Sequence, residues 1–112
     1  MVEIRQITED YSVAPQIQAS DVAAIKAAGF RTIISNRPDA EDGAVPHDEI
    51  EAAARAAGLE FLYIPVNSGH KKSENVDDQA AALDGMPAPV LAYCRSGTRC
   101  TNLYGLVQQK RG

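Results

Sequence analysis

The chain has 112 residues, of which 45% are hydrophobic, and it carries a formal net charge of −4 at neutral pH. This length suits one domain, the apolar content argues against disorder, and an acidic chain without a long basic run argues against nucleic acid as the main partner. No stretch approaches the roughly 20 apolar residues of a membrane span; we expect neither a secretory leader nor a membrane partner, and therefore a cytoplasmic protein.

The first half of the chain alternates between the periods of strands and helices. Val2 to Ile7 alternates apolar and polar residues, which predicts a half-buried strand, and Tyr11 to Ala14 is expected to form a second, short strand. Ser20-Asp21 is typical of a helix N-terminus, and Gly29 marks the end of that helix. The β-branched run within Phe30 to Ser35 predicts a buried strand.

The second half continues the alternation after a loop at Asn36 to Gly43. Its predicted elements are a helix at Asp48–Ala57, a strand at Leu59–Val66, a helix at Asn75–Leu83, a strand at Pro89–Tyr93 and a helix from Arg99 onward. Strands that alternate with helices predict an α/β fold with parallel neighbours. We take residues 1–112 as a single domain, and its end at Gly112, soon after the last helix begins, suggests a trimmed domain or one module of a longer protein.

The most informative segment is the loop Cys94-Arg95-Ser96-Gly97-Thr98-Arg99, which joins an apolar strand to a helix. Such a loop turns backbone N–H groups inward, the helix adds a partial positive charge, and Gly97 permits the tight curvature. These N–H groups and the two guanidiniums are expected to lower the pKa of the Cys94 thiol and make it a nucleophile. The alternative is a buried structural cysteine beside surface arginines. We expect Cys94 to be catalytic, with substrate bound by Arg95, Ser96, Gly97, Thr98 and Arg99.

The chain has two cysteines, Cys94 and Cys100, and both lie in this segment. Neighbouring thiols are a poor way to staple a fold, and they favour reactivity or metal binding instead. Neither His47 nor His70 stands at the spacing of a zinc finger. We therefore expect no metal and no other cofactor.

The whole chain resembles the phosphatase-like domain named after the beta-lactamase hydrolase-like proteins. The matching features span most of residues 1–105: Asp10-Tyr11-Ser12-Val13, Gly29-Phe30, Asn36-Arg37-Pro38-Asp39, Ala56-Ala57-Gly58-Leu59, Ile64-Pro65-Val66 and the Cys94 loop. The resemblance implies a dual-specificity-phosphatase-like fold, three layers α/β/α around a mostly parallel sheet of about four to five strands. Members often continue with a further helix after the segment where this chain stops. The loop alone is also similar to the active-site loop of rhodaneses, which are sulfurtransferases.

The two resemblances imply different reactions, and three residues distinguish them. Tyrosine and dual-specificity phosphatases place Arg six residues after the cysteine, where this chain has Cys100; Arg99 falls one residue short, as in many rhodaneses. Phosphatases usually have His before the cysteine, whereas this chain has Tyr93. Where they carry a general-acid Asp, this chain has Asn67, which cannot protonate a leaving group. His70 is a candidate substitute acid, or else a solvated loop residue.

We therefore hypothesise first a sulfurtransferase, in which Cys94 takes sulfane sulfur from thiosulfate or a persulfide and passes it to a thiol. Sulfur leaving groups are stable anions, so this reaction needs no acid. The second hypothesis is a phosphatase that acts on a phosphoester through a Cys94 phosphoenzyme. The third is an anion-binding module without turnover. Some members of the family are fused to a persulfide dioxygenase, which makes such an enzyme, fused or separate, an expected partner for the first hypothesis.

Other residues are accessory candidates. Cys100 is either a resolving thiol that attacks an oxidised or persulfurated Cys94, or a small residue packed in the first helical turn. Arg37 follows a strand end, so it either faces the crevice of Cys94 or pairs with Asp39 or Glu41. The run His70-Lys71-Lys72 either draws an anionic substrate to the cleft or forms a solvated loop.

Overall fold

A computed structural model of the chain describes residues 3–67 and 73–111. Five strands form one sheet in the order β1-β2-β5-β3-β4. β2, β5, β3 and β4 run parallel, and β1 pairs antiparallel with β2 at one edge. The strand bounds are β1 (Arg5–Gln6), β2 (Tyr11–Ala14), β3 (Thr32–Ser35), β4 (Glu60–Tyr63) and β5 (Val90–Tyr93). The carboxyl ends of the four parallel strands therefore share one edge, where ligands bind in open α/β sheets.

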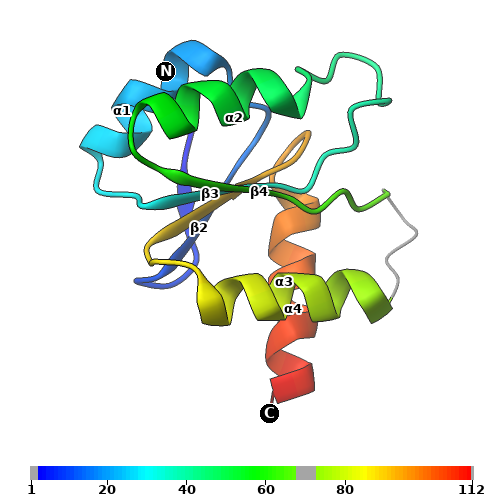
Figure 1. The fold of residues 1–112 in the computed structure, drawn as a ribbon. Coiled ribbons are helices and arrows are strands. Elements are labelled where there is room, and N and C mark those ends of the chain that lie inside the picture. Colours follow the sequence, from blue (N-terminus) through cyan, green and yellow to red (C-terminus); the bar gives the residue numbers. More distant parts are fainter. Residues whose placement is uncertain (1–2, 68–72, 112) are drawn as a thin grey trace.

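Helices cover both faces of the sheet (Figure 1). The short 3₁₀ helix η1 (Ala19–Asp21), α1 (Val22–Ala27) and α2 (His47–Ala56) lie on one face. α3 (Ser73–Gly85) and α4 (Thr98–Arg111) lie on the other. This arrangement confirms the predicted three-layer α/β/α fold with a mostly parallel sheet.

The predicted strands lie in the right places. The strand expected at Tyr11 to Ala14 has the observed bounds of β2, and the other four are longer than the observed ones. The strand expected at Val2 to Ile7 pairs only at Arg5 and Gln6, which are both exposed, and Val2 lies outside the described residues. β4 ends at Tyr63, although Val66 still donates its N–H to Asn36 beyond the end of β3. Pro65 has no N–H to offer, so the regular ladder cannot continue through it.

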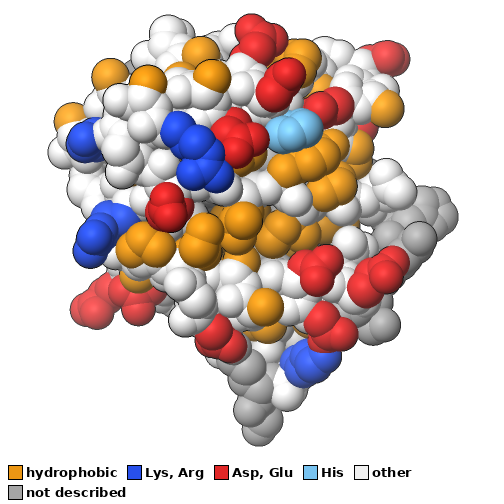
Figure 2. All heavy atoms as spheres, in the orientation of Figure 1, with side chains coloured by type: hydrophobic (Ala, Val, Ile, Leu, Met, Phe, Trp, Pro, Cys, Tyr) orange, Lys and Arg blue, Asp and Glu red, His pale blue; other side chains and the backbone are white. Residues whose placement is uncertain are grey.

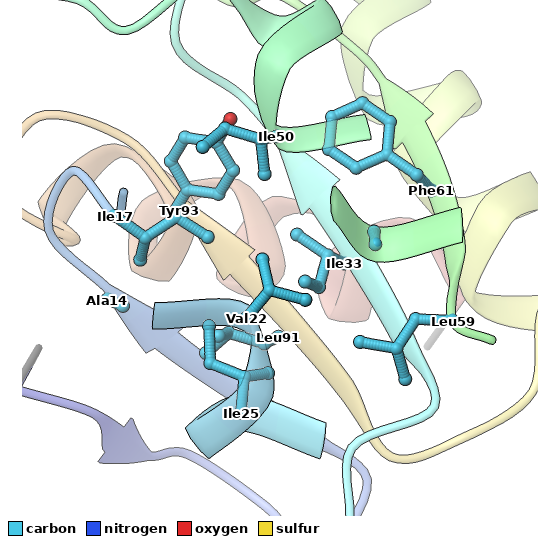
Figure 3. Packing of buried hydrophobic residues seen from close by; sticks show 11 residues of the cluster. Ala14, Ile17, Val22, Ile25, Ile33, Ile50, Leu59, Phe61, Leu91 and Tyr93 are labelled. Carbon is cyan, nitrogen blue, oxygen red and sulfur yellow. The ribbon is translucent and has the colours of Figure 1, made fainter. Parts of the chain in front are cut away.

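Alternate residues of the central strands enter the two halves of the core. Ile33 and Leu91 point toward α1 and α2, where they pack with Ile25 and Ile50 (Figure 3). The residues next to them in sequence, such as the fully buried Ile34, pack on the other face of the sheet against α3 and α4. Both faces of β3 and β5 are thus buried, as expected for parallel strands covered by helices.

One face of the molecule carries a band of apolar side chains along the sheet edge between the two helical layers, with acidic side chains both above it around α2 and below it around α3 (Figure 2). None of the described helices is long and apolar enough to span a membrane.

A buried polar network joins α3 to the carboxyl edge of the sheet. The side chains of Gln79 and Asn36 exchange two hydrogen bonds, of 3.0 and 3.2 Å, and Asn36 also donates to the carbonyl of Ile64 at 2.9 Å. Gln79 donates further to the hydroxyl of Tyr11, which in turn donates to the carbonyl of Cys100 at 2.9 Å. The network therefore connects the first turn of α4 to Tyr11, the first residue of β2, and to Asn36, which directly follows β3.

We predict that Gln79→Leu lowers the free energy of unfolding by about 1–3 kcal/mol, because the buried Asn36 amide loses both of its hydrogen bonds with Gln79 and its Oδ1 is left without that donor. Urea unfolding measures the loss. Gln108→Leu, at an exposed position of α4, is the matched control and should change stability by less than about 0.5 kcal/mol. Equal effects of the two variants would contradict a structural role for the network.

Candidate active site

Cys94 lies at the base of a tight loop directly after β5. Its backbone N–H donates to Ala14 at the end of β2, and its side chain is buried. The loop folds back so that the N–H of Gly97 donates to the Cys94 Sγ at 3.1 Å. Gly97 has φ +90° and lies 3.6 Å, measured from a Cβ placed on it, from the carbonyl of Ala14. A side chain at this position would strain the backbone, so the cradle requires glycine here.

Hydrogen bonds lower the pKa of Cys94 from 9.0 to about 5. The largest contribution comes from the side chain of Cys100, and backbone N–H groups of Cys100, Ser96 and Gly97 add to it. Burial opposes this lowering but does not outweigh it. The Cys94 thiolate is therefore the main form at neutral pH, as a nucleophile requires.

Cys100 is fully buried in the first turn of α4 and packs in the same cluster as Cys94. Burial, and then its contact with Cys94, raises the pKa of Cys100 well above the usual value. Cys100 thus stays a neutral thiol that donates its S–H to the Cys94 thiolate. This donor role was not among the sequence-based expectations.

Arg99 does not extend into solvent, and its exposed fraction is 7%. Its Nη1 donates to the carbonyl of Val66 at 2.9 Å and lies 2.9 Å from Oε2 of Glu41. Its Nη2 donates to Oε1 of Glu41 at 3.2 Å. Arg95, by contrast, is exposed. The expectation that both guanidiniums stabilise the thiolate needs correction, because one is paired with a carboxylate, the other faces solvent, and hydrogen bonds dominate the lowered pKa.

Arg37 forms the ion pair with Glu41 that was one of its two expected roles, but the guanidinium is buried rather than on the surface. Its exposed fraction is 5%, and its Nε donates to Oε1 of Glu41 at 3.1 Å. Its Nη1 donates to Oε1 of Gln16 at 3.0 Å. The N–H of Gln16 donates to the carbonyl of Arg95 in the Cys94 loop. Arg37 therefore links the segments after β2 and β3 to this loop.

The other candidate residues of the site that the structure describes are exposed to solvent. Ser96 and Thr98 are exposed, and their hydroxyls share a 3.2 Å hydrogen bond at the start of α4. Asn67 is exposed directly after Val66, whose carbonyl binds Arg99. The run His70-Lys71-Lys72 lies outside the described residues. Within residues 3–67 and 73–111, no cluster of His, Cys, Asp and Glu side chains is suited to a metal ion.

Sequence reasoning missed the residues that support the loop. Glu41 was considered only as a surface partner of Arg37, although the i,i+4 spacing of Arg37 and Glu41 was a usable signal. Gln16, Tyr11 and Gln79 carry no local pattern that points to Cys94, because only the fold brings them to it.

Comparisons with known proteins point to phosphatases. The family model described as "Beta-lactamase hydrolase-like protein, phosphatase-like domain" matches residues 3–111. A Beta-lactamase hydrolase-like protein of Agrobacterium fabrum is 33% identical over 102 residues, which cover 90% of this chain and 24% of that protein. This chain thus spans about a quarter of the length of that curated relative.

Solved structures agree in fold. A Neisseria meningitidis protein, provisionally described as a phosphatase, has a TM-score of 0.87 at 32% identity, over 97% of this chain and 78% of that one. A Shewanella putrefaciens protein with a similar provisional description has a TM-score of 0.84 at 27% identity, over 97% and 69% of the two chains. P. aeruginosa TpbA in complex with pTyr, with a TM-score of 0.70 and 19% identity over 95% and 64%, shares the fold. The family model and the Neisseria and Shewanella structures are described as phosphatase-like or as phosphatases. None of these comparisons lends support to the predicted sulfurtransferase or to a persulfide dioxygenase partner.

We predict that the ultraviolet absorbance of the Cys94 thiolate titrates with a midpoint near pH 5. The thiolate forms above this pH and is protonated below it, so the signal should fall as the pH is lowered through the midpoint. Cys94→Ser should remove the transition, and Cys100→Ala should raise its midpoint because a donor to the thiolate is lost. A wild-type midpoint near 9 would contradict the hydrogen-bonded cradle.

Proposed function

The chain belongs to the family of the phosphatase-like domain of Beta-lactamase hydrolase-like proteins, and from this premise we propose that it is a cysteine-based phosphatase acting on phosphoesters. The observation that carries the proposal is the Cys94 sulfur, which accepts the Gly97 N–H and has a pKa of about 5. This site combines a nucleophile with backbone amide donors, which are the groups that stabilise a developing oxyanion.

In the first proposed step, the Cys94 thiolate attacks phosphorus in line with the ester oxygen. The S–P bond forms as the P–O bond breaks, and the leaving alkoxide or aryloxide departs with the electron pair. Asn67 offers no acidic proton, and in this mechanism the leaving group takes its proton from water. This favours substrates whose leaving groups are already stable anions, such as aryl phosphates.

In the second proposed step, water attacks the phosphorus of the phosphocysteine. The S–P bond breaks, its electrons return to sulfur, and inorganic phosphate leaves while the proton of the attacking water passes to solvent. The donors that lower the pKa of Cys94, above all the S–H of Cys100, make this thiolate a good leaving group. The loop N–H groups bind the phosphoryl oxygens through both steps.

Sulfur transfer stays a second candidate because of one observation, the length of the loop. Arg99 stands one residue earlier than in tyrosine phosphatases, which makes the ring of N–H groups smaller. A smaller ring suits a persulfide on Cys94 better than a phosphoryl group. The family and the structural relatives outweigh this feature, and the reaction itself is open to direct test.

We predict that the wild-type protein hydrolyses an aryl phosphate and that Cys94→Ser abolishes the reaction, since a hydroxyl is a far weaker nucleophile at neutral pH. Release of the phenol measures turnover. The same preparation should give thiosulfate-to-cyanide transfer no faster than background, and its intact mass should not gain a sulfur atom from a sulfane donor. A stable persulfide adduct together with no phosphatase activity would replace the phosphatase by the sulfurtransferase.

Asn67→Asp should raise the hydrolysis of alkyl phosphates by about tenfold or more, because the carboxylic acid can protonate a poor leaving group. Aryl phosphates with good leaving groups should gain much less. Asn102→Asp, an equal change in charge at an exposed position of α4, is the control and should leave both rates unchanged. If Asn67→Asp changes the alkyl and aryl rates equally, Asn67 does not occupy the position of the acid.

A further inference from the structure

The carboxylate of Glu41 contacts one edge of the Arg99 guanidinium and does not contact the edge that contains Nε. The two Nη atoms form the end-on edge, and both contact the Glu41 carboxylate, Nη1 at 2.9 Å and Nη2 at 3.2 Å. The side-on edge of a guanidinium consists of Nε and Nη2, and it is a second fork for an oxyanion. Among the residues that the structure describes, Nε of Arg99 has no hydrogen-bond partner.

The Arg99 guanidinium is also tied to the scaffold. Nη1 donates to the backbone carbonyl of Val66 at 2.9 Å and approaches that of Asn36 at 3.5 Å. A backbone carbonyl next to a strand end cannot move aside for a substrate. The end-on edge of Arg99 is therefore committed to the protein itself.

Glu41 is in turn held by Arg37, which shares the Oε1 atom with Nη2 of Arg99. Arg37 donates to Oε1 of Glu41 at 3.1 Å, and the Nη atoms of Arg37 bind Gln16 and the carbonyl of Asp42. Two guanidiniums, each more than nine-tenths buried, thus share one carboxylate and leave a net charge of +1 at the site. This residual charge is of the sign that an oxyanion near Cys94 requires.

We propose that Glu41 is a positioning residue of the anion site: it fixes Arg99 so that the side-on edge faces an oxyanion bound over Cys94, while Arg37 holds Glu41. This inference rests on the proposed function in one respect only, the binding of a tetrahedral oxyanion in the loop. It does not depend on turnover.

A carboxylate on an anion-binding arginine has two opposite consequences. If Glu41 competed with the substrate for Arg99, neutralising the Glu41 carboxylate would free Arg99 and tighten anion binding. If Glu41 positions Arg99, its neutralisation frees the guanidinium to rotate and weakens anion binding, although the local charge becomes more positive. Because the two readings predict opposite signs, one substitution separates them.

The decisive experiment is calorimetric titration of wild type and Glu41→Gln with inorganic phosphate, in parallel with aryl phosphate kinetics. We expect Glu41→Gln to weaken phosphate binding and lower kcat/KM by about tenfold or more, as misplaced binding groups do. Glu51→Gln is the matched control, because it also breaks an i,i+4 Glu–Arg pair, with Arg55, but at the exposed surface of α2. The control should stay within about twofold of wild type.

Glu41→Asp guards against a variant that fails to fold. It keeps the charge between the two arginines but is too short to bridge them, so it should fold and still bind phosphate more weakly than wild type. The titration gives two separate quantities, the dissociation constant and the fraction of protein that is able to bind. A merely structural role of Glu41 would lower the fraction that binds and leave the dissociation constant unchanged. Equal or tighter phosphate binding by a folded Glu41→Gln or Glu41→Asp would overturn the inference.

The two proposals fail in different ways. Wild-type protein that binds phosphate but hydrolyses no phosphoester would overturn the proposed phosphatase, while the comparison of dissociation constants still decides the role of Glu41. Wild-type protein that binds no phosphate would overturn the positioning role, because no oxyanion site would exist.

Discussion

The burial of two guanidiniums at the carboxyl edge of the sheet is the constraint on which the site depends. A buried charge is costly unless it is paired and hydrogen-bonded, so Arg37 and Arg99 need acceptors at fixed places. Gln16 supplies one after β2, Glu41 supplies two oxygens after β3, and the carbonyl of Val66 supplies one after β4. The two guanidiniums find all of these acceptors only when the segments after the four parallel strands are in place. Their burial therefore fixes the position of the segments that surround the Cys94 loop.

Inside these walls the thiolate of Cys94 is stabilised by neutral donors rather than by a cation in contact. The S–H of Cys100 and the N–H groups of the loop lower its pKa, while Arg99 is occupied by Glu41. This division has a chemical advantage. The loop dipoles and the S–H of Cys100 hold the anion, so Arg99 is not needed for that purpose, and its Nε has no hydrogen-bond partner among the described residues.

The order of elements in this fold was predictable because local physics decides it. The runs Phe30 to Ser35 and Pro89 to Tyr93 were expected to be strands, and Thr32–Ser35 and Val90–Tyr93 within them form the central parallel strands. The ends of elements were less predictable, because pairing partners decide how far a strand extends. The strand expected at Val2 to Ile7 is two residues long, since only Arg5 and Gln6 meet a partner.

For the candidate site, the sequence by itself determined the Cys94 loop: a strand, a cysteine, a glycine able to adopt positive φ, and the start of a helix are all local features. It also located Arg37 and Arg99. Only the tertiary structure decided what these groups do, because Arg99 and Glu41 are 58 residues apart and Tyr11 and Cys100 are 89 apart. Hydrogen-bond partners at such separations are chosen by strand order and by the demand that buried polar groups be satisfied, and neither leaves a periodic pattern in the chain.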